Sequence, residues 1–312
     1  MNKDTIGIDV SKDTLDAHRL SDGKAQRFTN DRSGHTALLH WLAKDVVGRI
    51  VFEATGPYTR EFERAMASAG LPLVKVNPRQ ARRFAEAIGT LAKTDRVDAA
   101  MLARMGAALE IPAQPPVSES MEELQELLRA RRALSKDRTA AHNRAKVLTL
   151  PLLKRQNIQH LKQIDKHLAA INAAITQSIA EDDILARRFA ILSSIPGIAD
   201  ITAHALIIEM PELGALDGKK AASLVGLAPM TRQSGKWVGK AKIRGGRANL
   251  RRALYMPALV ACRFNPDLKA KHSQLREAGK PPKVAITAVM RKLIVLANAL
   301  LRDNREWAHK AA

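Results

Sequence analysis

The sequence predicts an α/β protein, with a mixed-sheet domain at the N-terminus and a mostly α-helical remainder. Three observations predict this class. Short β-rich runs near the N-terminus are followed by strands that alternate with helical patterns, which is typical of a mixed sheet. A proline-rich stretch, Ile111 to Ser120, then precedes a region from Met121 to Asp182 that lacks glycine. A chain of 312 residues is long enough for about two domains.

The N-terminal elements follow from residue type and turn signals. Thr5–Val10 (TIGIDV), Leu15–Leu20 and Gln26–Thr29 predict three strands of an antiparallel meander, with Ser21-Asp22-Gly23 as the second turn. The pattern then predicts, in order, a helix, a strand, a helix, a strand and further helices, over Thr36–Lys44, Arg49–Phe52, Thr59–Ala69, Leu73–Val76 and the residues beyond Pro78.

The region without glycine predicts long helices with a coiled-coil seam. Its apolar residues step by three and four in alternation, at Leu161, Ile164, Leu168, Ile171 and Ile175. A second helix has to cover such a seam. The sequence leaves open whether that helix belongs to the same chain or to another subunit.

Two further patterns follow in the C-terminal third. Ser194–Ile198 (SIPGI) and the helical Asp200–Glu209 resemble a helix-hairpin-helix, in which a glycine lets the backbone approach a phosphate. An ordinary proline-glycine turn between two helices explains the same residues. Lys280–Arg302 predicts an amphipathic helix with basic flanks, and we expect it to serve packing.

The charge of the chain indicates a polyanionic partner. Lysine and arginine number 51 against 31 acidic residues, which gives a formal charge of +20 and a pI near 10.4. Such a protein attracts nucleic acid. No apolar run approaches the ~20 residues of a spanning helix, and MNKDTIGIDV lacks the apolar core of a signal peptide. We therefore expect a cytoplasmic protein with no membrane partner.

Four acidic residues stand where predicted strands end and a predicted helix begins. Asp9 closes the first strand and Glu53 closes the strand at Arg49–Phe52, while Asp95 and Asp98 open a helix on one face. The single cysteine excludes a disulfide framework or a thiolate zinc site, and the nine histidines show no ligand-like clustering, so any metal must be held by oxygen. Converging carboxylates in a basic protein suit Mg²⁺ shared with substrate phosphates. One such acid alone is more often a cap or a solvated residue, and it is the combination that predicts a metal site.

A lone hydroxyl lies in the most basic segment. Arg232–Arg247 reads RQSGKWVGKAKIRGGR and holds Ser234 among lysine, arginine and glycine, a setting in which the backbone can approach a phosphate. From these residues alone, Ser234 is interpreted as a turn hydroxyl, and the cations as phosphate contacts or solvated residues. These cations are Lys236, Lys240, Lys242, Arg244, Arg247, Arg251 and Arg252.

Together these motifs resemble the DEDD-type transposases of the bacterial insertion-sequence family numbered one hundred and ten, also described as bridge-RNA-guided recombinases. The resemblance covers nearly the whole chain in unbroken order. It departs from the family pattern at Ala199, where a second glycine is common, and at Trp237, which occupies a variable position. The motifs are GIDVSKDTLD, FEATGPY, NPRQARRFAEAIGTLAKTDRVDA, SIPGIADITA, LVGLAP and SGKWVGKAKIRGGRANLRRALYMPAL.

The resemblance implies a RuvC-like domain of RNase H type, a helical coiled-coil insertion and a C-terminal transposase domain with a helix-hairpin-helix-like segment. We place them at residues 1–112, 118–188 and 189–312. It further implies that Ser234 attacks DNA and that four acids hold Mg²⁺, or Mn²⁺ in its place. Lys93, Arg96 and the basic residues around Ser234 are then expected to contact nucleic acid. The four acids are Asp9, Glu53, Asp95 and Asp98.

The partners implied by the resemblance are donor DNA, target DNA and a bridge RNA from the noncoding end of the element. Further copies of the chain are also expected, as a dimer assembling to a tetramer, in the bacterial cytoplasm at the nucleoid. Two other interpretations compete with an RNA-guided serine recombinase: a RuvC-like nuclease or Holliday-junction resolvase that uses water, and a non-catalytic nucleic-acid-binding protein. A hydrolytic nuclease would not need Ser234, and a binding protein would not need the four acids.

Overall fold

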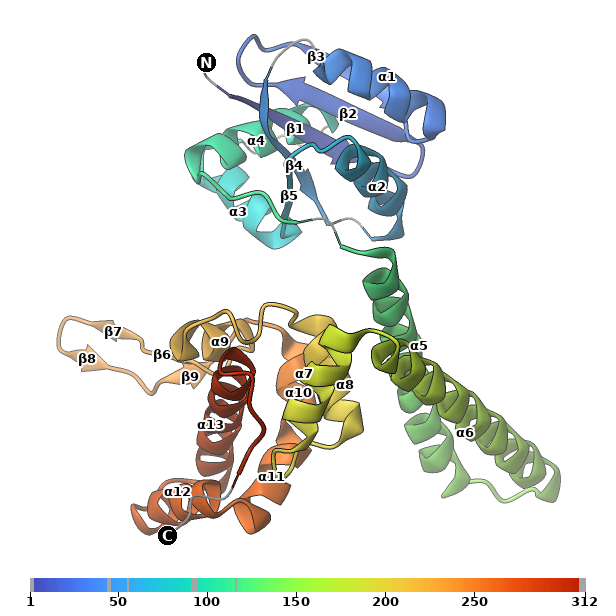
Figure 1. Cartoon of the computed structure of the whole chain (residues 1–312), viewed down its shortest axis with the longest axis vertical. Helices are drawn as coiled ribbons and strands as arrows, with labels where there is room; N and C mark the ends of the chain where they lie inside the picture. The colour runs from blue at the N-terminus through green and yellow to red at the C-terminus, as the bar shows by residue number, and fades with distance from the viewer. Residues whose placement is uncertain (1–2, 44–45, 55, 91–94, 116, 309–312) are drawn as a thin grey trace. The chain divides into compact units, whose positions relative to one another are not determined.

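The computed structural model describes residues 3–43, 46–54, 56–90, 95–115 and 117–308, with only the backbone of residues 57, 95 and 96. The chain forms two compact units, Met1–Ser118 and Glu119–Ala312 (Figure 1). The junction between them falls in the proline-rich stretch. The division into three domains remains a prediction.

The N-terminal unit is built on a five-stranded mixed sheet with the strand order β3-β2-β1-β4-β5. β1 pairs antiparallel with β2 and parallel with β4. β2 pairs antiparallel with β3, and β4 pairs parallel with β5. The expected meander and the mixed α/β class are confirmed. The strands are β1 (Asp4–Val10), β2 (Thr14–Arg19), β3 (Ala25–Thr29), β4 (Val47–Glu53) and β5 (Leu73–Val76).

Helices cover both faces of this sheet (Figure 1). On one face Ile6, Ile8 and Phe52 pack with α1 (Arg32–Leu42) and α2 (Arg60–Ser68), which follows the short helical turn Pro57–Thr59. On the other face Val51 and Val74 pack with α3 (Pro78–Ala87) and α4 (Asp95–Ala108). Successive strand residues point to opposite faces, so alternation along β1 and β4 decides which side chains meet α4.

The second unit begins with a helical hairpin of α5 (Glu119–Ala145) and α6 (Pro151–Ala180). The two helices run antiparallel, because Arg138 Nε donates to Asp165 at 2.7 Å and Arg131 Nε donates to Asn172 at 2.6 Å. Within the expected seam, Ile164 and Ile175 are fully buried. A helix of the same chain therefore covers the seam.

The remaining helices pack around one apolar core. α13 is the one helix among the described residues that is long and apolar enough to cross a membrane by length and composition. Its Val289, Leu293 and Ala297 are completely buried in this core, so the expected packing role is confirmed. The helices are α7 (Asp183–Ser193), α8 (Asp200–Glu209), α9 (Gly218–Leu224), α10 (Ala248–Ala253), α11 (Tyr255–Phe264), α12 (Pro266–Glu277) and α13 (Pro282–Arg302).

Between α9 and α10 the chain leaves the helical core as a β-ribbon, residues 229–243, which we call the arm (Figure 1). Near the core, β6 (Pro229–Met230) pairs with β9 (Lys242–Ile243). Further out, β7 (Gln233–Ser234) pairs with β8 (Trp237–Val238). The sequence predicts a turn hydroxyl at Ser234 but no strands here, since strands of two residues give no periodic signal.

Candidate functional site

The parallel pairing of β1 with β4 brings two of the four acids together. Ile8 lies in register with Phe52, and the next residue on each strand is Asp9 and Glu53. Since Ile8 and Phe52 face α1 and α2, Asp9 and Glu53 face α4. Neighbouring strands are about 4.8 Å apart, so the two side chains extend from adjacent backbone positions on the same face of the sheet.

α4 approaches this face of the sheet closely because two glycines leave room for it. A Cβ on Gly7 would overlap the backbone of Ala99 and Ala103 in α4. On the helix side, a Cβ on Gly106 would come within 3.3 Å of the Thr5 side chain. Gly7 is thus level with the Ala99–Ala103 turn, and Thr5 is level with Gly106, so α4 runs antiparallel to β1.

This crossing places the start of α4 beside the end of β1. Two residues along a strand span about 7 Å, which equals four to five residues along a helix. Asp9 lies two residues beyond Gly7 on β1, so it is level with the first turn of α4, which contains Asp95 and Asp98. The backbone segments that bear the four acids therefore lie at one edge of the sheet.

The side chains of Asp9, Glu53 and Asp98 are half-buried at this edge. Asp95 and Arg96 are described by their backbone alone, and Lys93 lies outside the described residues. Among the described side chains, no group of three or more aspartate, glutamate, histidine or cysteine residues is placed to hold a metal ion. The donor set nevertheless fits a hard divalent cation by its chemistry, because every member is a carboxylate.

Two other acids near this edge already have basic partners. Asp16 lies directly opposite Asp9 on β2 and accepts three hydrogen bonds of 2.9–3.1 Å from Arg27. Glu63 accepts hydrogen bonds from Thr59 at 2.5 Å and from Lys75 at 2.6 Å. Asp16 was not among the four acids expected at this edge.

A register argument could have found Asp16. The turn after β1 is closed by the Ser11 amide, which donates to the Thr14 carbonyl at 2.9 Å. A turn this short fixes which residues of β1 and β2 face each other. Its recognition from sequence would have placed Asp16 across from Asp9.

Ser234 stands at the outer end of the arm and is exposed. It pairs with Trp237 across a tight turn in which Gly235 has a φ of +55°. Trp237 is 59% exposed, and its indole lies over Gly239, where a Cβ would overlap the ring. A hydroxyl at such a tip is accessible to a large substrate.

Two arginines that were expected to contact nucleic acid instead hold the base of the arm against the core. Arg251 Nη1 donates to the carbonyls of Gly245 at 2.7 Å and Gly226 at 3.3 Å. Arg247 forms an ion pair with Glu212 at 2.5 Å. Both cations therefore have partners within the chain. Lys236, Lys240 and Lys242 are exposed along the arm, and Arg244 is exposed directly after it. Arg252 on α10 donates to Asn249.

The SIPGI segment forms an ordinary turn between α7 and α8. Gly197 has a φ of +107°, and a Cβ there would lie 2.6 Å from the Pro257 carbonyl oxygen and 3.1 Å from Ala261. The glycine thus permits close packing on α11. Asp200 occupies the first turn of α8, where its negative charge disfavours a phosphate. This geometry favours the packing explanation over a phosphate contact.

Comparisons with known proteins agree along the whole chain. A family model for DEDD transposases of the IS110 type matches residues 6–151, and one described as "Transposase IS116/IS110/IS902 family" matches residues 189–273. The pilin gene-inverting protein of Moraxella bovis is 31% identical over 98% of both chains, and that of Moraxella lacunata is 32% identical over the same shares. An uncharacterized 43.6 kDa protein of insertion element IS110 from Streptomyces coelicolor is 30% identical over 36% of this chain and 28% of its own.

Both halves of the chain match transposase models, and the two pilin gene-inverting proteins align with it over almost their full length. The DEDD-type model also indicates use of a divalent metal. The chain therefore belongs to the IS110 family of transposases, enzymes that cleave and rejoin DNA strands.

Proposed function

We propose that this chain is the transposase of an insertion sequence and that it cuts and rejoins DNA through a covalent phosphoserine at Ser234. In this proposal the N-terminal unit is a RuvC-like domain of RNase H type, and its strand order β3-β2-β1-β4-β5 supports that assignment. The observation that carries the proposal is the packing of α4 against β1 and β4, which brings the backbone segments of the four acids to one edge of the sheet. These acids are Asp9, Glu53, Asp95 and Asp98.

The four carboxylates would hold a divalent cation, Mg²⁺ or Mn²⁺. Such a cation, when bound, neutralises phosphate charge and polarises a phosphodiester. The close packing of α4 against Gly7 supports this role, because it fixes the helix start relative to the strand ends. Pre-organised ligands of this kind need no rearrangement when the substrate arrives.

Ser234 supplies the nucleophile in the proposed reaction. Its Oγ forms a bond to phosphorus while the bond from phosphorus to one DNA strand breaks; the hydroxyl proton leaves, and the departing strand oxygen gains a proton. The number of phosphoester bonds is unchanged, so a strand-end hydroxyl can reverse the attack and rejoin DNA without a high-energy cofactor. Lys236 and Lys240, exposed on the same arm, would stabilise the negative charge that develops at phosphorus.

The proposed partners are donor DNA, target DNA and a bridge RNA that specifies both by base pairing. Two relatives are named for inverting a gene, and inversion requires DNA to be cut and rejoined at two sites. These names support the same class of reaction for this chain. The exposed cations of the arm support contact with a nucleic-acid backbone, which carries no sequence information by itself. Base pairing by an RNA would supply that information.

The test is whether DNA becomes covalently attached to Ser234. Parent protein, divalent cation, the element's noncoding RNA and matching DNA should give an adduct that survives denaturing electrophoresis and disappears after protease treatment. Ser234→Ala should give none. Thr231→Ala is the matched control, since it removes another exposed hydroxyl from the same arm, and it should form the adduct normally.

Two outcomes would reject the serine assignment. One is normal cleavage by Ser234→Ala, and the other is an adduct that mass spectrometry maps to a different side chain. The first would favour a RuvC-like nuclease or a Holliday-junction resolvase that uses water, because such an enzyme never retains DNA on the protein. The second would keep a covalent mechanism and assign the nucleophile to that other side chain.

A further inference from the structure

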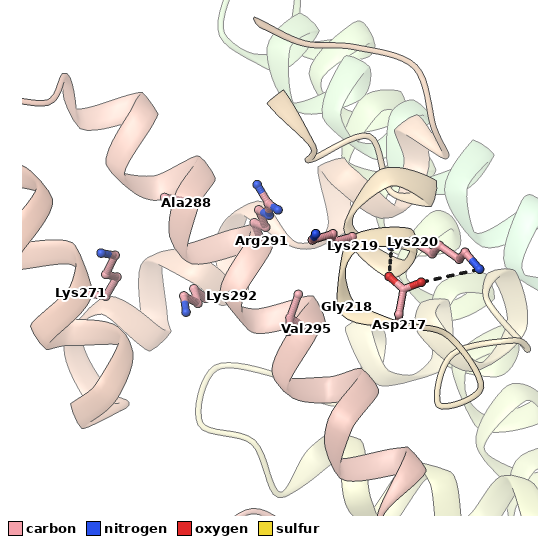
Figure 2. A pocket seen from close by; sticks show the side chains of 9 residues that line it. All are labelled: Asp217, Gly218, Lys219, Lys220, Lys271, Ala288, Arg291, Lys292 and Val295. Atoms are coloured by element: carbon pink, nitrogen blue, oxygen red, sulfur yellow. Dashed lines mark hydrogen bonds and ion pairs between the residues drawn. The ribbon is translucent and has the colours of Figure 1, made fainter. Parts of the chain in front are cut away.

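A basic pocket of about 960 Å³ lies among α9, α12 and α13 (Figure 2). Five cationic side chains line it, against one carboxylate, Asp217. None of them was among the expected nucleic-acid contacts. The cations are Lys219, Lys220, Lys271, Arg291 and Lys292.

Most of this positive charge lacks a counter-charge. Lys220 pairs with Asp217 at 3.7 Å, and Lys271 donates to the neutral Gln274 at 2.8 Å. Over the part of the chain that the structure describes, no ion pair is recorded for Lys219, Arg291 or Lys292. Figure 2 shows Lys219 of α9 and Arg291 of α13 directed into the same space. Like charges that face one hollow repel each other unless an anion enters.

The packing of the helices builds the hollow. Gly218 lets α9 approach α13, since a Cβ there would lie 3.1 Å from the Val295 side chain. On α13, Met290 and Leu293 are buried in the core, so Arg291 and Lys292 between them emerge on the outer side. A smaller pocket of about 360 Å³ shares Lys271, Lys292 and Val295 with the first. The second pocket adds no cation of its own and one carboxylate, Asp267. We call the two pockets together the basic groove.

We propose that this basic groove binds backbone phosphates of the DNA on which the enzyme acts. The proposal rests on the proposed function in one respect, namely that the arm carrying Ser234 acts on the same DNA. Lysine is a compact point charge that contacts phosphate without requiring one orientation, and four of the five cations are lysines. Such contacts position a duplex and do not read its sequence.

The lining argues against a pocket for a free nucleotide. No aromatic side chain is among the described residues that line either pocket, so a base has no ring on which to stack. The cations are instead spread over three helices, and two of them, Lys271 and Lys292, line both pockets. The reaction established for the family is on DNA, which makes DNA the polyanion to expect here.

The groove is tied to the arm through α9. Gly218 begins this helix at the groove, and the Leu224 carbonyl at its other end accepts the Arg247 amide at 2.7 Å beside the arm base. Seven helical residues span about 10 Å, and the ten residues from Leu224 to Ser234 add at most about 34 Å. The groove end of α9 therefore lies within about 44 Å of Ser234, or about thirteen base pairs of duplex.

The experiment compares two double variants with the same loss of charge, both in a Ser234→Ala background that cannot react. Arg291→Gln/Lys292→Gln removes groove cations, whereas Lys162→Gln/Lys166→Gln removes two exposed lysines from α6. Affinity for duplex DNA is measured by fluorescence anisotropy from about 50 to 200 mM salt. The groove variant should lower the log–log salt slope by about 1.8, since each lost phosphate contact is worth about 0.9. The α6 variant should leave the slope unchanged.

Lys219→Gln provides a second groove variant from a different helix, and its slope should fall by about 0.9. Far-UV circular dichroism melts establish that each variant folds. The same titrations with the element's noncoding RNA separate the two polyanions. Equal slopes for groove and α6 variants overturn the proposal, and so does a slope change with RNA but none with duplex DNA.

Failure of the serine assignment leaves this test intact, because only binding is measured. A groove variant with a reduced slope would stand even if Ser234→Ala proved fully active. Phosphate-ethylation interference then gives the position: the phosphates affected by Arg291→Gln/Lys292→Gln should fall within about thirteen base pairs of the cleavage point. Interference spread evenly along the duplex would contradict a defined groove.

Discussion

Single glycines set how closely α4 approaches the strands that carry Asp9 and Glu53. Gly7 in β1 and Gly106 in α4 carry no Cβ at the points where helix and sheet approach each other. The start of α4 is thereby held against the ends of β1 and β4. The position of Asp98 relative to Asp9 thus depends on residues that have no chemical role.

The first prediction concerns Asp98. Asp98→Asn keeps the size of the side chain and removes one charged oxygen ligand, so strand cleavage should fall about 100-fold or more. Affinity for DNA should stay nearly unchanged, because a lost carboxylate is not a lost phosphate contact. Asp95→Asn should behave in the same way. Cleavage assays on labelled DNA and anisotropy titrations measure the two effects.

Asp13→Asn is the control for this substitution, since Asp13 is an exposed carboxylate just beyond β1. It should cleave DNA as the parent does. Cleavage at the parent rate by both Asp95→Asn and Asp98→Asn would remove the metal site from the proposed mechanism.

The second prediction concerns His204, which is buried in α8 and whose Nε2 has no hydrogen-bond partner among the described residues. Burial lowers the pKa of His204; Asp200 raises this pKa and Arg131 lowers it to smaller extents. In the unfolded chain a histidine gains its proton near pH 6.5. Below that pH the unfolded state binds more protons, so the free energy of unfolding falls by up to about 1.4 kcal/mol per pH unit from this group.

His204→Phe should reduce this acid sensitivity while preserving the stacking on Phe189, whose ring lies 5.2 Å away. Urea unfolding followed by circular dichroism at pH 8 and pH 5.5 measures the difference. His142→Gln, which alters an exposed histidine, should retain the acid sensitivity of the parent. An identical loss of stability in His204→Phe and the parent would show that His204 titrates normally.

Among the elements, the arm depends most on a few anchors. Its strands contain two residues each, too few to stabilise a ribbon alone, and a two-stranded ribbon is marginal in water. Arg251 compensates by donating to the carbonyls of Gly226 and Gly245 where the arm leaves the core. The arm is thus oriented by its base.

The third prediction separates two neighbouring arginines by role. Arg251→Gln removes charge-assisted hydrogen bonds worth about 1.5–3 kcal/mol at the arm base. Adduct formation at saturating DNA should fall about tenfold or more, and limited proteolysis of the arm should become faster. Arg252→Gln instead removes an exposed cation, so it should lower the salt slope of DNA binding by about 0.9 and leave the adduct yield unchanged.

The opposite pattern would contradict this division. If Arg251→Gln changed only the salt slope and left proteolysis and adduct yield at the parent level, Arg251 would be a phosphate contact. The hydrogen bonds at the arm base would then contribute little to its order.

Periodicity and turn chemistry were enough to predict the elements of the sheet. The strands at Thr5–Val10 and Leu73–Val76, and the helix opening at Asp95, lie where the sequence indicates. Each has a local cause, either β-branched runs between turns or a period of three to four. The arm was missed because two-residue strands among glycine and lysine leave no such pattern.

The site was less predictable, because it depends on contacts between distant segments. The packing of Gly197 on α11 was one of two explanations left open by the sequence. Arg247 and Arg251 were expected to contact nucleic acid, since nothing local points to Glu212 or to the carbonyls at the arm base. The basic groove arises in the same way from three separate helices.

On the scale of the whole molecule, the helical hairpin limits how copies of the chain can associate. The seam through Ile164 and Ile175 is already covered by α5. By contrast, apolar residues around the turn that joins α5 and α6 are each more than half exposed. Exposed apolar side chains gathered in one place favour a protein contact. They are Val147, Leu150, Leu152 and Ile158.

The last prediction is that the protein is a homo-oligomer and that this turn contributes to its interface. Mass photometry of the parent, with and without the noncoding RNA, should give a mass above that of one 34.2 kDa chain. Leu152→Ser/Ile158→Ser should shift the distribution toward the monomer without changing the helical content, because both side chains are exposed. Leu168→Asp/Ile171→Asp should instead lower the melting temperature, since both residues lie half-buried along the seam with α5. A parent mass equal to one chain under both conditions would rule out the oligomer, and an unchanged mass in Leu152→Ser/Ile158→Ser would place the interface elsewhere.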